Sequence, residues 1–77
     1  MKLRIRYFGR FAVEIGKFSE EIEIQENAKV RDLIELLRKK YPQLKHEVIE
    51  ISIRGRYASE DSPLEDEVAV YSMISGG

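Results

Sequence analysis

Residues 30–42 read VRDLIELLRKKYP and form the most regular stretch of the chain. Asp32 in the first turn and Arg38 in the last turn would oppose the partial charges of a helix dipole. Pro42 ends the segment, and Asn27 is the expected cap at its start. Apolar residues recur at intervals of three and four, the period of one buried helix face: Val30, Leu33, Ile34, Leu37 and Tyr41. The segment therefore predicts one helix that covers a face of a small sheet.

Two segments before the helix, KLRIRYF at 2–8 and SEEIEIQ at 19–25, alternate between charged residues and branched or aromatic ones. A period of two is typical of half-buried strands. Opposite charges on the outward faces favour an antiparallel pair of these strands. The expected charge partners are Arg4 and Arg6 with Glu21 and Glu23. The residues expected to face the core are Leu3, Ile5, Tyr7, Ile22 and Ile24.

Further strands are predicted after the helix. VIEISI at 48–53 alternates, and the turn-forming pair 54–55 would lead into a short returning strand at 56–59. EVAVY at 67–71 forms the last strand. A short helical turn is expected at 10–15, between the first two strands.

This order of elements predicts an α+β fold of the β-grasp (ubiquitin-like) type. One main helix packs on a mixed sheet of four to five strands, with the first and last strands parallel and central. A chain of 77 residues has room for one domain. We therefore expect a single domain over 1–77, in which 72–77 form a flexible C-terminal tail.

Composition excludes several classes of site. There are no cysteines, and His46 is the only histidine, which excludes disulfides, thiolate metal sites and zinc sites built on several imidazoles. Thirteen basic and fourteen acidic residues give a net charge of −1, which favours neither nucleic acid nor an acidic membrane. The apolar runs are too short to span a bilayer, and the first residues lack a signal-peptide block. We expect no metal, no bound cofactor, no nucleic-acid or membrane partner, and a cytoplasmic location.

Three charged features are better explained as ordinary surface. The basic stripe of Lys2, Arg4 and Arg6 has no aromatic platform for nucleic-acid bases beside it. His46 has no nucleophile motif nearby, so a surface histidine is favoured over a general base. The acidic residues of 60–67 lack the glycine-bearing spacing of a calcium loop.

Two other features point to a partner. Phe8 and Tyr71 are expected on the sheet face opposite the helix. Together with Tyr57 and Met73, they are either partner contacts or partly buried strand ends. The chain ends in Gly76-Gly77, directly after an apolar run. Glycine contributes nothing to a core, but its backbone can pass through a narrow channel.

In its opening, its helix and its ending, the chain resembles the ubiquitin-like sulfur carriers, above all the small subunit of molybdopterin synthase. The likeness covers almost the whole chain. It rests on RIRYFGRFAVEIG, KVRDLIELLRKKYPQL and SPLEDEVAVYSMISGG.

The resemblance implies that the chain is no enzyme on its own but the sulfur-donating subunit of a sulfurtransferase complex. A ubiquitin-activating-type enzyme would use ATP to adenylate the C-terminal carboxylate of Gly77, next to Gly76, and sulfur would convert it to a thiocarboxylate. The large subunit of molybdopterin synthase would then receive the tail, and sulfur would pass to a pterin precursor of molybdenum or tungsten cofactor. The residues expected to contact these partners are Phe8, Tyr71, Met73, Ile74 and Ser75.

Three alternatives stay open at this stage. A thiamine-pathway sulfur carrier and a ubiquitin-like modifier conjugated to lysines share the same fold and tail. A non-enzymatic β-grasp interaction module, in which the diglycine has no role, belongs to a different functional class.

Overall fold

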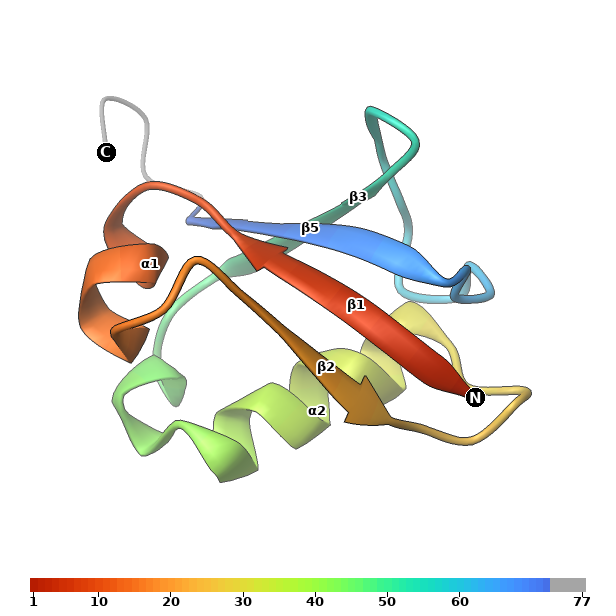
Figure 1. Cartoon of the computed structure of the whole chain (residues 1–77), viewed down its shortest axis with the longest axis horizontal. Helices are drawn as coiled ribbons and strands as arrows, with labels where there is room; N and C mark the ends of the chain where they lie inside the picture. Colours follow the sequence, from red (N-terminus) through yellow and green to blue (C-terminus); the bar gives the residue numbers. More distant parts are fainter. Residues whose placement is uncertain (73–77) are drawn as a thin grey trace.

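The computed structural model describes residues 1–72, and residues 73–77 lie outside the described part of the chain. In Figure 1, α2 crosses one face of the sheet, while the opposite face carries no helix from the described residues. The elements, in chain order, are β1 (Lys2–Tyr7), α1 (Arg10–Ile15), β2 (Ser19–Glu23), α2 (Val30–Lys40), the 3-10 helix η1 (Pro42–Leu44), β3 (Ile49–Ile53), β4 (Arg56–Tyr57) and β5 (Glu67–Ser72). The predicted mixed sheet with one main helix is confirmed.

The strand order is β2-β1-β5-β3-β4, and β1 and β5 run parallel to each other. Ile5 lies opposite Val68 and Tyr7 opposite Val70, so both strands turn their apolar residues to the same side. The other strand pairs are antiparallel. The predicted parallel pairing of the first and last strands is therefore correct.

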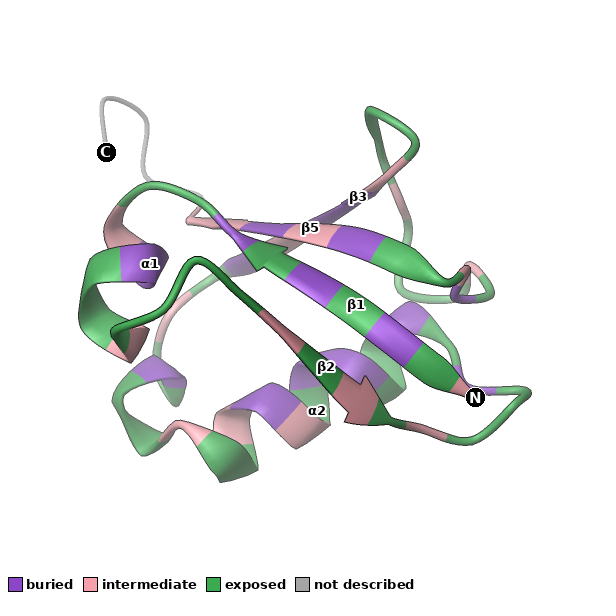
Figure 2. Ribbon diagram, in the orientation of Figure 1, coloured by how far each residue is buried: buried purple, intermediate pink, exposed green. Residues whose placement is uncertain are grey.

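The core lies between α2 and the sheet. Figure 2 shows buried and exposed bands alternating along β1, as a strand with one covered face requires. η1 and α1 lie side by side at one end of this layer, where they contribute Leu44 and Phe11, both fully buried (Figure 1). The largest fully buried side chains are Leu3, Ile5, Phe11, Leu33, Leu37, Leu44 and Ile51.

The start of α2 differs from the prediction. Lys29, not Asn27, is the N-cap residue. The Lys29 backbone N–H donates to the carboxylate of Asp32 at 2.8 Å, so a side chain inside the first turn satisfies this end of the helix. Ala28 is buried in the loop before the helix, and the backbone is still extended at Lys29, so the cap lies two residues beyond the asparagine.

The register of β1 and β2 also differs in part. Leu3 lies opposite Ile22, but Ile5 lies opposite Glu20, so only one of these two core-facing residues of β1 meets an isoleucine of β2. Antiparallel partners run in opposite directions along the sequence, so a step forward in β1 is a step back in β2.

The same register decides the ion pairs on the open face. Arg4 meets Glu21 at 3.1 Å, as predicted. Arg6 lies opposite Ser19 and pairs with Glu67 of β5 at 3.5 Å, so its expected pairing with Glu23 is wrong.

The predicted turn after β3 is present. Arg54 and Gly55 have φ values of 55° and 79°, the left-handed conformation that a two-residue hairpin turn requires at both positions. At the far end of the sheet, β5 continues through Ser72, which pairs with Ile49. The strand thus includes Ser72, the first residue of the predicted tail.

Candidate functional site

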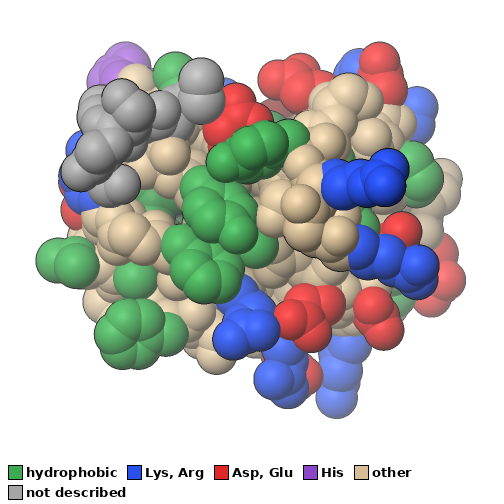
Figure 3. All heavy atoms as spheres, turned by 90° about the horizontal axis from the view of Figure 1, so that it is seen from above, with side chains coloured by type: hydrophobic (Ala, Val, Ile, Leu, Met, Phe, Trp, Pro, Cys, Tyr) green, Lys and Arg blue, Asp and Glu red, His purple; other side chains and the backbone are tan. Residues whose placement is uncertain are grey.

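An aromatic patch of Phe8, Tyr57 and Tyr71 lies on the open face of the sheet. The parallel register places Tyr7 beside Val70, so the next residues, Phe8 and Tyr71, fall side by side. Their rings stack with centroids 4.9 Å apart and an angle of 10° between the planes. Tyr57, from the short strand β4, meets Tyr71 edge-on at 6.0 Å. Figure 3 shows hydrophobic side chains gathered at the middle of this face.

Charged residues border the aromatic patch. The guanidinium of Arg6 lies 6.0 Å from the centre of the Phe8 ring and also pairs with Glu67. A groove of about 370 Å³ runs beside Phe8 and Tyr71, and its lining includes the Arg54–Glu65 ion pair, whose atoms are 2.8 Å apart. An exposed apolar centre with a charged rim is typical of a protein interface.

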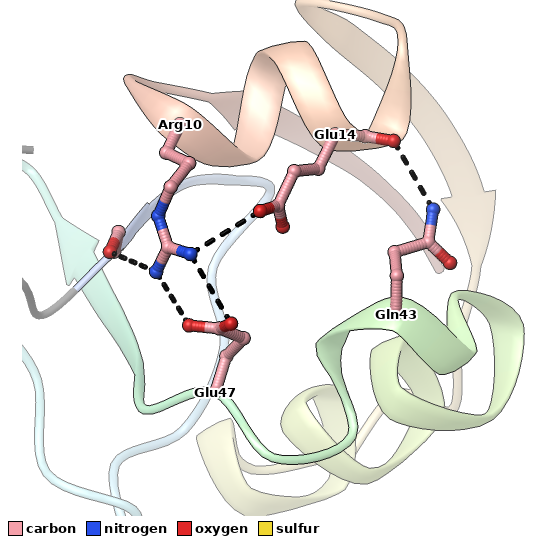
Figure 4. A network of polar contacts seen from close by, with 5 residues as sticks. Arg10, Glu14, Gln43 and Glu47 are labelled. Carbon is pink, nitrogen blue, oxygen red and sulfur yellow. Dashed lines mark hydrogen bonds and ion pairs between the residues drawn. The ribbon is translucent and has the colours of Figure 1, made fainter.

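A polar network centred on Arg10 holds the last residue of β5. Arg10 Nη2 lies 2.5 Å from Glu47 Oε1 and 3.1 Å from Ser72 Oγ, and Nη1 lies 3.3 Å from Glu14 Oε2. Figure 4 shows this guanidinium between the two carboxylates, with Gln43 donating to the backbone oxygen of Glu14. The network joins α1, the segment after η1 and the end of β5.

The charges of this network stabilise one another. The hydrogen bond to Glu47 raises the pKa of Arg10, and the same bond lowers the pKa of Glu47. Both side chains therefore stay ionised over the neutral range. Neither group is poised to exchange a proton near neutral pH, so the arrangement suits a structural role at the end of β5.

The most perturbed carboxyl group lies on the helix side of the sheet. Burial of Glu20 favours its neutral form, but hydrogen bonds from Tyr41, Tyr7 and Lys40 outweigh that effect and lower its pKa to about 2. Burial and the bond to Glu20 raise the pKa of Tyr7. The tyrosine hydroxyls donate to Glu20 at 2.5 and 2.6 Å. This cluster ties the edge strand β2 to the end of α2, so we interpret it as structural.

The structure brings together three of the residues proposed from sequence, Phe8, Tyr57 and Tyr71. Met73, Ile74, Ser75, Gly76 and Gly77 lie outside the described residues. No local sequence pattern points to Arg10, because its partners Glu47 and Ser72 are 37 and 62 residues away along the chain.

Other chemistry finds little support in the part of the chain that the structure describes. His46 is exposed. Between residues 1 and 72, no three His, Asp or Glu side chains lie close enough together to hold a metal ion. None of the helices described there is long and apolar enough to cross a membrane.

A helix-covered mixed sheet with parallel central strands and an aromatic open face defines a β-grasp protein of the ubiquitin-like class. The ThiS family model matches residues 5–77. The chain therefore belongs to the ThiS family, and the resemblance to ubiquitin-like sulfur carriers seen in the sequence is confirmed.

Solved structures support the same placement. A protein from Pyrococcus furiosus, provisionally described as molybdopterin converting factor, subunit 1, is 37% identical, with 96% of this chain and 99% of that one covered and a TM-score of 0.85. Small archaeal modifier protein 1 of Haloferax volcanii is 21% identical over the full length of both chains, with a TM-score of 0.81. Its counterpart from Methanosarcina acetivorans is 23% identical, with 99% and 96% covered and a TM-score of 0.75. The two modifier proteins show the fold alone. No curated protein matched the chain.

Proposed function

We propose that this protein is a sulfur carrier that acts as the small subunit of molybdopterin synthase. Its terminal carboxylate, on Gly77 next to Gly76, is adenylated and converted to a thiocarboxylate, which donates sulfur to a pterin precursor. The protein is no enzyme by itself and works in the cytoplasm. It holds no cofactor, and its activating partner uses the ATP.

The observation that carries this proposal is the relation to the Pyrococcus furiosus protein described as molybdopterin converting factor, subunit 1. Identity of 37% extends over nearly the full length of both chains. Membership of the ThiS family supports the same chemistry. The matches to archaeal modifier proteins are below a quarter identity, so they favour the fold and not the conjugation function.

The proposed chemistry needs little from the domain itself. An α-carboxylate has a pKa of roughly 3.5, so it is ionised at neutral pH and can attack the α-phosphorus of ATP while pyrophosphate leaves. The acyl-adenylate is a far better electrophile than the carboxylate. A sulfur nucleophile from the sulfur source then displaces AMP. The aromatic patch of Phe8, Tyr57 and Tyr71 would hold the partners while their own residues perform these steps.

Deletion of Gly77 tests the proposal. The full chain and the shortened chain are incubated with a ubiquitin-activating-type enzyme and ATP, and AMP attachment is followed by mass spectrometry. We expect the full chain to accept AMP and the shortened chain to fail, while circular dichroism shows the same fold for both. AMP attachment to the shortened chain would refute the terminal-carboxylate mechanism.

The intact mass of the protein purified from its native cell separates the pathways. Replacement of one oxygen by sulfur indicates a sulfur carrier. Lysine adducts that carry a Gly-Gly remnant of the chain indicate a protein modifier. Mass spectra with neither product favour a β-grasp interaction module. Reconstitution with the large synthase subunit and a pterin precursor then distinguishes the molybdopterin role from a thiamine role.

A further inference from the structure

The outer edge of β2 and the groove beneath it lie away from the aromatic patch. β2 is the first strand of the sheet, and within residues 1–72 only β1 pairs with it. In Figure 1 it lies at the margin of the sheet, with α2 below it. The space between Ile24 of the chain after β2 and Leu36 of α2 forms a groove of about 530 Å³.

The hydrogen-bonding pattern shows which backbone groups face outward. Met1 and Ile24 exchange two bonds, of 2.6 and 3.0 Å. Antiparallel pairs alternate between bonded and non-bonded positions, so Ile22 and Glu20 also point their backbone groups toward β1. The N–H and C=O groups of Ser19, Glu21 and Glu23 therefore point away from the sheet. They form a row of hydrogen-bonding groups spaced as a further strand requires.

The side chains around this edge define what would fit. On the helix side, Ile24, Ala28 and Leu36 give the groove an apolar floor. On the open side, Glu21 and Glu23 project beside the edge, with 49% and 74% of their side chains exposed. Arg4 contacts Glu21 at 3.1 Å and the N-terminal amine lies 4.0 Å from Glu23, yet both carboxylates remain accessible.

A second copy of this chain fits the edge poorly. In a two-fold antiparallel pair of β2 strands, the outward-facing Glu21 and Glu23 would meet the same residues of the other copy. Like charges directly opposite each other are unfavourable. The other free edge, β4, is only two residues long and offers a short ladder. The charge pattern therefore favours a basic partner over self-association.

We propose that the outer edge of β2 binds an extended segment of another protein as a sixth strand of the sheet. In the bound segment, apolar residues alternate with lysine or arginine. The apolar side chains enter the groove against Ile24 and Leu36, and the basic side chains lie beside Glu21 and Glu23. This inference does not depend on the chemistry proposed for the C-terminal tail.

The probe is a heptapeptide of alternating valine and lysine, acetylated and amidated, added to the isotope-labelled full chain. We expect saturable NMR shifts confined to residues 19–24 and to the Asp32–Leu36 side of α2. The amides of Glu21 and Glu23 should exchange more slowly with solvent. The same peptide with glutamate in place of lysine should not bind.

Two variants test the mode of binding. Glu23→Pro removes an outward N–H and leaves the hydrogen bonds to β1 intact. It should therefore lower the affinity for the probe peptide by about tenfold or more. Glu21→Lys tests whether the acidic side chains attract the lysines of the probe. Glu60→Lys, on the other side of α2, is the control and should bind the probe as tightly as the unmodified chain. Absence of probe binding, equal binding of the acidic peptide, unchanged affinity of Glu23→Pro or shifts centred on Phe8 and Tyr71 would each overturn the proposal.

Discussion

At the residue scale, Glu20 shows how one carboxylate can fasten an edge strand. The register of β2 turns it toward the helix, where only 10% of its side chain is exposed. Lys40 approaches it at 2.9 Å, and the hydroxyls of Tyr7 and Tyr41 donate to its other oxygen. A buried carboxylate is stable only with such partners. The cluster therefore predicts a dependence of stability on pH.

The pKa of Glu20 falls from its ordinary value of 4.5 to about 2 on folding. A depressed pKa means that the stabilisation is present above about pH 4.5 and is lost as the pH falls toward 2. Glu20→Gln should therefore lower the free energy of unfolding by about 2 kcal/mol at pH 7. The difference from the unmodified chain should shrink between pH 4.5 and 2, as measured by urea unfolding.

The matched control is Glu21→Gln, which affects an exposed ion pair with Arg4. Such pairs contribute less than about 1 kcal/mol, so this variant should stay close to the unmodified chain at every pH. Equal pH profiles for Glu20→Gln and the unmodified chain would show that the cluster does not carry the acid dependence.

At the element scale, the end of β5 is held from two sides. Ser72 pairs with Ile49 of β3. Arg10 of α1 donates hydrogen bonds to the Ser72 hydroxyl and to the Glu47 carboxylate. Arg10 itself begins a helix of only six residues, which would be marginal without such contacts. The network thus couples a short helix to the strand from which the C-terminal residues continue.

Arg10→Ala should loosen the end of β5 without unfolding the sheet, because it removes the group that joins Glu47 to Ser72. We expect faster hydrogen exchange at Tyr71 and Ser72 and unchanged exchange in the middle of β1. Arg4→Ala, which removes an exposed pair, should leave both regions unchanged. Unaltered exchange at the end of β5 in Arg10→Ala would show that the strand pairing alone fixes it.

At the scale of the whole molecule, the two faces of the sheet differ in burial and composition. One face is buried against α2, and the other carries the aromatic patch beside the end of β5. Stacked aromatic residues with a charged rim are common at the energetic centre of protein interfaces. The aromatic patch is thus the surface that we propose for docking of the activating enzyme and the large synthase subunit.

The double substitution Phe8→Ala and Tyr71→Ala should weaken binding to the activating enzyme or to the large synthase subunit by about tenfold or more. Both side chains lie outside the core, so the thermal unfolding midpoint should change little. Val48→Ala removes an exposed apolar side chain elsewhere and serves as the control. Unchanged affinity of the double variant, measured by calorimetry, would exclude the aromatic patch as the docking surface.

The sequence by itself determined the elements, the fold class and the family. Periods of two and 3.6 residues decide which side chains a strand or helix can bury, and these periods are local properties that need no knowledge of distant contacts. The helix Val30–Lys40, the inward residues Leu3 and Ile5, and the position of Phe8 and Tyr71 on the open face all follow from them.

Only the tertiary structure decided which polar groups meet outside the predicted Arg4–Glu21 pair. Arg10 finds Glu47 and Ser72, and Glu20 finds Tyr41, across separations that no local pattern records. The helix cap at Lys29 and the partner of Arg6 also depended on the exact register of loops and strands. Hydrogen bonds and ion pairs form over a few ångströms, so a register shift of two residues changes every polar partner although it keeps the apolar side chains on the buried face.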